Sequence, residues 1–134
     1  MTAVPLRFGT LVTCIDGRVQ RPTIIWMREQ YNIDFVDVIS EPGPDKLLAE
    51  ADPNIVVSVE KKVAFSVRAH VSRIVGICGH FDCAGNPATP DEHRAQIRQS
   101  VQLARSWNLP AQVVGLWLNE NWQIEVVEPP LEMP

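Results

Sequence analysis

The chain has 134 residues, of which 46% are hydrophobic and 21% charged, and this length and composition are typical of one soluble globular domain. The net charge of −4, with basic residues scattered along the sequence, argues against a nucleic-acid partner, and no apolar stretch is long enough to cross a membrane. The N-terminal sequence MTAVPLRFGT lacks the apolar core of a signal peptide, and three cysteines are an odd count for a disulfide-bonded secreted chain. We therefore expect a cytoplasmic protein whose thiols have a metal-binding or catalytic role.

The first half of the chain predicts two strands and two helices. Residues 8–13, FGTLVT, form a short apolar run that is typical of a buried strand. A helix is expected over about 22–30, with a proline in its first turn. A second strand is expected at 33–39, followed by the breaker EPGP and by a loop or one short helical turn at 44–54. In 55–70 the valines recur on one helical face, which favours a helix.

The second half predicts three strands and one helix. RIVGIC at 73–78 is expected to be the third strand of the chain. TPDE at 89–92 is typical of a helix N-terminus, with threonine as the cap and proline at the first helical position, and this helix should end at Asn108. AQVVGLWL at 111–118 predicts the fourth strand, and WQIEVV at 122–127 predicts a fifth that returns antiparallel to it.

This alternation of strands and helices predicts an α/β fold. We expect a single three-layer domain over residues 1–134, with its core at about 8–128. The central sheet should be mostly parallel, with strand order 2-1-3-4 and the antiparallel fifth strand at the edge. In such sheets the carboxyl ends of the parallel strands meet at one edge, and ligands bind there where the strand order reverses.

Ligand-type side chains follow the first and the third predicted strand. Cys14, Asp16 and Arg18 come directly after the first strand, and His80 and Cys83 follow the third. Because both groups lie at the same edge of the predicted sheet, the two cysteines and the histidine should converge. Two thiolates and one imidazole suit Zn²⁺ and leave its fourth tetrahedral position open, as catalytic zinc sites require. The sequence therefore predicts a zinc site.

Each part of this pattern also has a purely structural interpretation. Cys14 could be a small buried residue at a strand end, and His80 a hydrogen-bonded loop histidine. Asp16 and Arg18 could form a surface ion pair of little energetic consequence. The placement of both groups at one edge favours the metal site over these readings. Cys78, inside the third strand, is expected to be a buried small hydrophobic residue.

Two polar residues near these motifs are expected to have no part in the chemistry. Asp82 lies between the presumed ligands, and we expect it to have a structural role, such as a hydrogen bond to a backbone amide; the alternative is that it orients a ligand. His93 lies in the first turn of the helix that TPDE begins. We expect His93 to be solvated, and the alternative role for it is a proton shuttle.

The two motifs, CIDGR and GHFDC, resemble those of the β-class carbonic anhydrases, which carry Cys-x-Asp-x-Arg after the first core strand and His-x-x-Cys after a later one. SVEKKVAFSVRAHVSRIVGICGHFDC is similar to that family's helix and strand leading to the histidine, and VVGLWLNENWQIEVVE resembles its closing hairpin. The resemblance extends from about residue 8 to 128. The chain is short for the family and is expected to lack its N-terminal helical arm.

The resemblance implies a zinc lyase that hydrates carbon dioxide reversibly to bicarbonate by means of a zinc-bound hydroxide. Cys14, His80 and Cys83 would hold the zinc. Asp16 would accept a hydrogen bond from the hydroxide or, alternatively, become a fourth zinc ligand. Arg18 would keep Asp16 ionised. The resemblance also implies a homodimer or a higher homo-oligomer.

The sequence departs from the family pattern in two segments. Residues 40–43 read Ser-Glu-Pro-Gly, where the family often has an Arg-Asn-Ala-Gly-like stretch, and residues 84–87 read Ala-Gly-Asn-Pro, where small glycines are usual. Two other functions therefore stay open: a zinc hydrolase for a related small electrophile, carbonyl sulfide or carbon disulfide, and a catalytically silent zinc-binding protein. A nucleophilic role for Cys14 is least supported, because no Cys-x5-Arg phosphate loop follows it.

Overall fold

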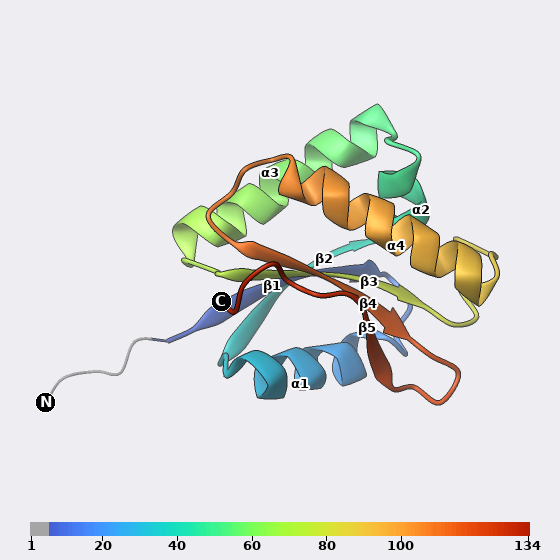
Figure 1. Cartoon of the computed structure of the whole chain (residues 1–134), viewed down its shortest axis with the longest axis horizontal. Coiled ribbons are helices and arrows are strands. Elements are labelled where there is room, and N and C mark those ends of the chain that lie inside the picture. Colours follow the sequence, from blue (N-terminus) through green and yellow to red (C-terminus); the bar gives the residue numbers. More distant parts are fainter. Residues whose placement is uncertain (1–5) are drawn as a thin grey trace, which may run out of the picture.

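The computed structural model describes residues 6–134, in which five strands and four helices alternate (Figure 1). In chain order these elements are β1 (Phe8–Cys14), α1 (Gln20–Tyr31), β2 (Phe35–Glu41), α2 (Pro44–Ala49), α3 (Pro53–Ala69), β3 (Ile74–His80), α4 (Pro90–Arg105), β4 (Gln112–Leu118) and β5 (Ile124–Glu128). None of the helices in this described part has the length and apolar character needed to span a bilayer. The predictions for the N-terminus and for a domain beginning at residue 1 reach residues 1–5, which lie outside the described residues.

The strands form one sheet in the order β2-β1-β3-β4-β5. β1 pairs in parallel with both β2 and β3, β3 pairs in parallel with β4, and β5 runs antiparallel to β4 at the edge. The predicted α/β fold and strand order are thereby confirmed. β1 lies beside β3 although a crossover through β2 separates them in the chain, so the strand order reverses between these two strands. The carboxyl ends of β1 and β3 therefore meet at the edge where open α/β sheets bind ligands.

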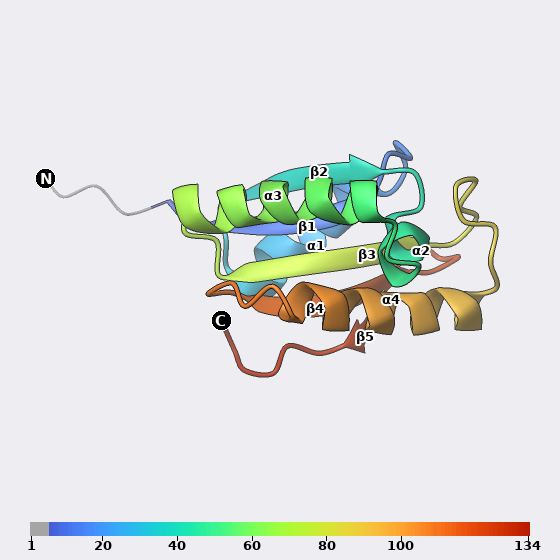
Figure 2. The same ribbon diagram turned by 90° about the horizontal axis from the view of Figure 1, so that it is seen from above.

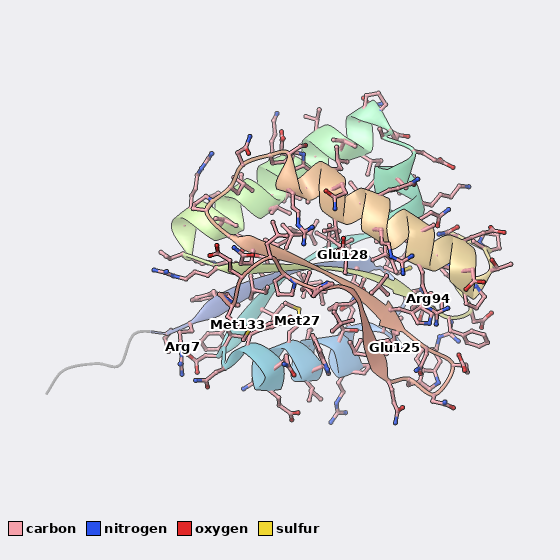
Figure 3. The ribbon with its side chains drawn as sticks, viewed as in Figure 1. Arg7, Met27, Arg94, Glu125, Glu128 and Met133 are labelled. Carbon is pink, nitrogen blue, oxygen red and sulfur yellow. The ribbon has the colours of Figure 1, made fainter. Side chains whose placement is uncertain are left out.

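Helices cover both faces of the sheet, as three layers require. α1 lies alone on one face, and α2, α3 and α4 cover the other (Figure 1). Seen from above, α3 and α4 both run along the strands, with β3 visible between them, and α2 lies near the carboxyl ends of β2 and β3 (Figure 2). Ion pairs join α4 to the edge strand β5, between Arg94 and Glu125 at 3.6 Å (both labelled in Figure 3) and between Arg105 and Glu128 at 3.8 Å.

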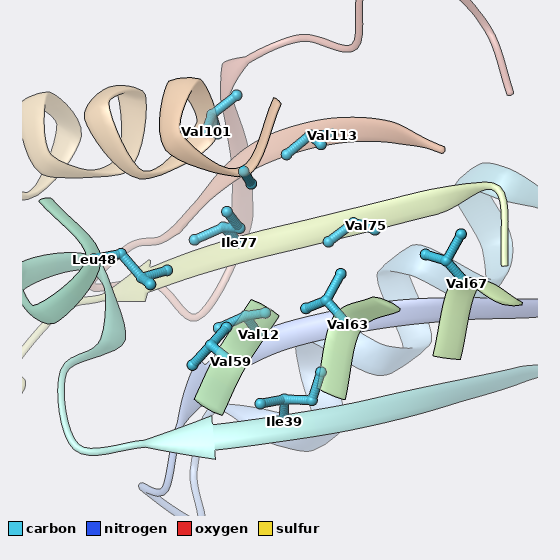
Figure 4. Close-up of a cluster of buried hydrophobic side chains, with 11 residues drawn as sticks. Val12, Ile39, Leu48, Val59, Val63, Val67, Val75, Ile77, Val101 and Val113 are labelled. Atoms are coloured by element: carbon cyan, nitrogen blue, oxygen red, sulfur yellow. The ribbon is translucent and has the colours of Figure 1, made fainter. Parts of the chain in front are cut away.

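Each face of the sheet packs its own hydrophobic cluster. Under α3 and α4, a cluster of mostly valine and isoleucine side chains fills the space to the sheet (Figure 4). α3 contributes Val59, Val63 and Val67, which recur every four residues as the sequence predicted. Full burial of one such side chain contributes about 1.5–3 kcal/mol. On the other face, Met27 points from α1 toward the sheet (Figure 3) and joins a second cluster that includes Cys14 and Cys83.

Several element boundaries differ by a few residues from those expected; α4, for example, ends at Arg105 and not at Asn108. Three of the differences lie near the candidate site. β3 continues to His80, because its last residue still pairs with Leu118 of β4, so the histidine ends the strand and does not follow it. β2 includes Ser40 and Glu41, since the ladder with β1 extends to the pair Cys14 and Glu41. The segment expected to be a loop or single turn forms the short helix α2, whose N-terminus is set by a proline. In each case regular secondary structure extends closer to the carboxyl edge of the sheet, where the candidate site lies, than the sequence predicted.

Candidate metal centre

The two ends of β1 and β3 bring the predicted metal ligands together. Cys14 is the last residue of β1, His80 is the last residue of β3, and Cys83 lies in the loop that follows. All three side chains are buried, and their ligand atoms lie within 4.8 Å of one another. In residues 6–134 no other group of three or more His, Cys, Asp or Glu side chains could hold a metal ion.

The imidazole of His80 is oriented as a metal ligand. Its Nδ1 donates a hydrogen bond to the carbonyl oxygen of Phe81 at 2.8 Å, so the lone pair of the neutral ring lies on Nε2. Nε2 is buried and has no hydrogen-bond partner among the described residues. Burial lowers the pKa of His80, which favours the neutral form that binds metals. A buried acceptor without a partner costs about 1–3 kcal/mol, and a cation at this position would satisfy it.

The two thiols also fit a metal ion. Sγ of Cys14 and Sγ of Cys83 lie 4.0 Å apart, and all three cysteines are free. Two sulfur ligands at about 2.3 Å from a tetrahedral zinc ion would be about 3.8 Å apart. Burial, and then the proximity of Cys14, raise the pKa of Cys83 to about 11. Without a cation the site therefore disfavours two adjacent thiolates, whereas a divalent ion would balance their charges. The donor set fits zinc.

Asp16 and Arg18 form a tight pair beside this centre. Arg18 Nη2 donates to Asp16 Oδ2 at 2.6 Å, Nε donates to Oδ1 at 3.0 Å, and the backbone amide of Arg18 donates to the same Oδ1 at 2.9 Å. These hydrogen bonds from Arg18 lower the pKa of Asp16 to about 2, so the carboxyl group is ionised near neutral pH. Asp16 is not among the converging ligand atoms. The carboxylate is engaged with the guanidinium.

Arg18 is itself held by two groups that the sequence did not reveal. It donates to the carbonyl oxygen of Asp82 at 3.1 Å and to Asp82 Oδ2 at 3.3 Å, and it lies over the ring of Trp122 at 5.1 Å. The partner of the Asp82 side chain is therefore the Arg18 guanidinium and not a backbone amide, which is compatible with the structural role expected for Asp82. Through these contacts Arg18 links the CIDGR segment, the loop between the candidate ligands His80 and Cys83, and the β4–β5 turn.

The expectation of a solvated His93 was wrong. The His93 side chain is 2% exposed, and its Nδ1 donates to Asp45 Oδ2 at 2.6 Å. Asp45 is buried in the first turn of α2, and no motif in the sequence pointed to it. One signal was available: His93 precedes Ile97 and Val101 by four and eight residues, so it lies on the buried face of α4. Cys78, by contrast, is fully buried as predicted, and burial raises its pKa to about 12.

This arrangement defines an α/β protein with a Cys-His-Cys centre at the carboxyl edge of its sheet. A profile of the family described as "putative carbonic anhydrase" matches residues 4–128. The chain therefore belongs to that family, which confirms the resemblance drawn from its two motifs. No curated protein matches the chain.

Solved structures of β-carbonic anhydrases share the fold. Isoform I from Trichomonas vaginalis is 18% identical, with a TM-score of 0.59, and the match covers 96% of this chain and 86% of that one. The carbonic anhydrase from Glaciozyma antarctica is 12% identical, with a TM-score of 0.61 and coverage of 93% and 86%. A β-carbonic anhydrase from Sordaria macrospora, described as tetrameric, is 12% identical, with a TM-score of 0.56 and coverage of 97% and 84%. At these identities the likeness shows the fold alone.

Proposed function

We propose that this protein is a zinc-dependent carbonic anhydrase, which hydrates carbon dioxide reversibly to bicarbonate. The observation that carries the proposal is the buried, unpartnered Nε2 of His80, which lies together with two buried thiols at the carboxyl edge of the sheet. Membership of the family supports it. A zinc ion held there would act as a Lewis acid that makes water a strong nucleophile near neutral pH.

Cys14, His80 and Cys83 are the proposed zinc ligands. Two thiolates balance the charge of a divalent cation, and the neutral imidazole adds a third ligand, which leaves one position for reaction. The hydrogen bond from His80 Nδ1 to the carbonyl of Phe81 fixes the ring plane and the tautomer. The His80 ring is therefore already oriented for metal binding in the metal-free protein.

Asp16 and Arg18 are the proposed catalytic pair. The low pKa of Asp16 keeps its carboxylate ionised, so it acts as a hydrogen-bond acceptor that orients the attacking water. Arg18 fixes both carboxylate oxygens, which keeps Asp16 from swinging toward the metal ligands. We propose that Asp16 serves as the acceptor in this arrangement and not as a fourth ligand.

We further propose that the protein forms a homodimer or a higher homo-oligomer in the cytoplasm. β2 is an edge strand with one unpaired side, and its Phe35 and Val38 are exposed apolar side chains, as a subunit contact requires. The tetrameric relative from Sordaria macrospora supports an oligomer. The three free cysteines are in keeping with a reducing compartment.

Stopped-flow hydration of carbon dioxide by the zinc-loaded protein tests the function. We expect a rate well above that of buffer, rising from about pH 7 to about pH 9, because this range brackets the acidity of water activated by zinc. The metal content of the same sample should be one zinc per chain. One zinc per chain without hydration at any pH would contradict the proposal and favour another small electrophile or a silent zinc-binding protein.

A further inference from the structure

The two segments in which the sequence departs from the family pattern pack against each other. Gly43 has a φ of +61°, and a Cβ there would lie 2.9 Å from the backbone of Gly85. A Cβ at Gly85 would in turn lie 2.8 Å from the backbone of Pro42. Real Cβ atoms essentially never approach other atoms to less than 3.0 Å, so neither position has room for a side chain. The turn after β2 and the loop after Cys83 therefore touch, backbone against backbone.

A buried polar network continues from this contact. Asp45 accepts a hydrogen bond on Oδ2 from His93 Nδ1 at 2.6 Å and on Oδ1 from Asn86 Nδ2 at 3.1 Å. The three side chains come from α2, α4 and the loop after Cys83, and each is at most 2% exposed. Three separate parts of the chain are thus joined at one carboxylate.

The donors and acceptors of this network match. Because His93 Nδ1 donates to Asp45, it does not also accept from Asn86. The two amide protons of Asn86 therefore go to Asp45 Oδ1 and to Gln96 Oε1, which lies 2.6 Å away. Ser100 Oγ has a single proton to donate, and it lies 2.8 Å from the backbone carbonyl oxygen of Gln96 and 3.0 Å from that of Asp45. Fully satisfied networks of this kind hold their members in one arrangement.

The network touches the chain on both sides of the metal ligands. A Cβ on Gly79, the residue before His80, would lie 2.5 Å from Asp45 Oδ2, so the carboxylate is packed directly against the end of β3. On the other side, the backbone amide of Asn86 donates to the carbonyl of Cys83 at 3.3 Å. The segment between these contacts contains two of the three proposed zinc ligands.

We propose that Asp45, Asn86 and His93 form a buried clamp that positions Cys83 for metal binding. They are positioning residues, since none of them is among the converging ligand atoms. The inference rests on the zinc site proposed above. Cys14 ends a strand that pairs on both sides, whereas Cys83 lies in a loop, so the third ligand is the one that needs such support.

Zinc affinity, measured by competition with a chromophoric chelator, tests the clamp. We expect Asn86→Ala to weaken zinc binding by about 10- to 100-fold, the range for groups that orient metal ligands. Gln96→Ala removes only one of the two acceptors of Asn86, so it should also weaken zinc binding, but by a smaller factor. This variant tests the clamp even if Asn86→Ala does not fold. Gln99→Ala, on the exposed face of α4, is the matched control and should leave the affinity unchanged.

A second measurement separates positioning from a general loss of stability. In metal-free protein, the alkylation rates of Cys14 and Cys83 are followed by peptide mass spectrometry. We expect Asn86→Ala to accelerate alkylation of Cys83 and to leave that of Cys14 unchanged. Equal acceleration of both thiols, or unchanged zinc affinity, would overturn the clamp. A wild-type protein that binds no zinc would contradict the proposed function instead, and the alkylation rates would still decide whether the clamp holds Cys83.

Discussion

Two carboxylates at the same end of the sheet are each paired with a basic residue at 2.6 Å, and they differ in almost everything else. The Arg18 and Asp16 side chains are 49% and 21% exposed, whereas those of His93 and Asp45 are 2% and 1% exposed. Water solvates the first pair and is excluded from the second. Equal contact distances therefore do not imply equal contributions to the stability of the fold. The exposed pair contributes little and is available for catalysis, whereas the buried pair is part of the packed structure.

The largest expected effect is on stability and concerns the buried pair. His93→Ala would leave the Asp45 carboxylate buried without its charged or donating partner, which costs about 3–5 kcal/mol. We expect this loss in the free energy of unfolding of metal-free protein, measured with urea. His70 is a matched control, because its Nδ1 also lies 2.6 Å from a carboxylate, that of Asp37, but the pair is partly exposed. An equal loss for His70→Ala would show that burial does not distinguish the pairs.

The next effect is on turnover and concerns the exposed pair. Asp16→Asn removes the ionised acceptor and should lower the rate of carbon dioxide hydration by about 100-fold or more, as is usual for acid–base groups. Zinc content should stay at one per chain, because Asp16 is not among the converging ligand atoms. Asp91→Asn, at an exposed carboxylate on α4, is the control and should keep the wild-type rate. An unchanged rate for Asp16→Asn would remove Asp16 from the mechanism.

The contrast between the pairs also explains what the sequence could predict. Asp16 and Arg18 are two residues apart, so their pairing was visible as a motif. The alternation of helices and strands predicted the α/β fold. With the first strand placed between the second and the third, as the structure has it, the convergence of Cys14 and His80 at neighbouring strand ends followed. These features depend on local periodicity and on general rules of α/β topology, which a single sequence contains.

The buried pair depends on information of another kind. Asp45 and His93 are 48 residues apart, and they meet only because α2 and α4 pack on the same face of the sheet. A histidine in the first turn of a helix usually faces water, and only its spacing to Ile97 indicated otherwise. The stacking of Trp122 on Arg18 likewise depends on the conformation of a turn that the sequence did not define. Tertiary packing, and not propensity, decided these contacts.

A smaller effect appears when the protein is acidified. The hydrogen bonds from Arg18 lower the pKa of Asp16 from 3.8 to about 2. A lowered folded-state pKa stabilises the protein above the unfolded-state value, and this contribution disappears as the pH falls toward the folded-state value. The small difference in unfolding free energy between wild type and Asp16→Asn, measured on metal-free protein, should therefore be constant above about pH 5 and vanish toward about pH 2. A difference that grows on acidification would contradict the assigned cause.

The smallest effect is the response to salt, and it compares the two pairs directly. Between about 0.1 M and about 1 M NaCl the Debye length falls from about 10 Å to about 3 Å, which screens exposed charges but hardly affects buried ones. The stability difference between wild type and Asp16→Asn at neutral pH should therefore narrow as salt is added. The difference between wild type and His93→Ala should persist, because no ions reach the space between α2 and α4. Persistence of both would show that the bidentate geometry of Arg18, and not its charge, holds Asp16. If both stability differences narrowed, water would have access to the clamp. The argument that a water-free network positions Cys83 would then fail.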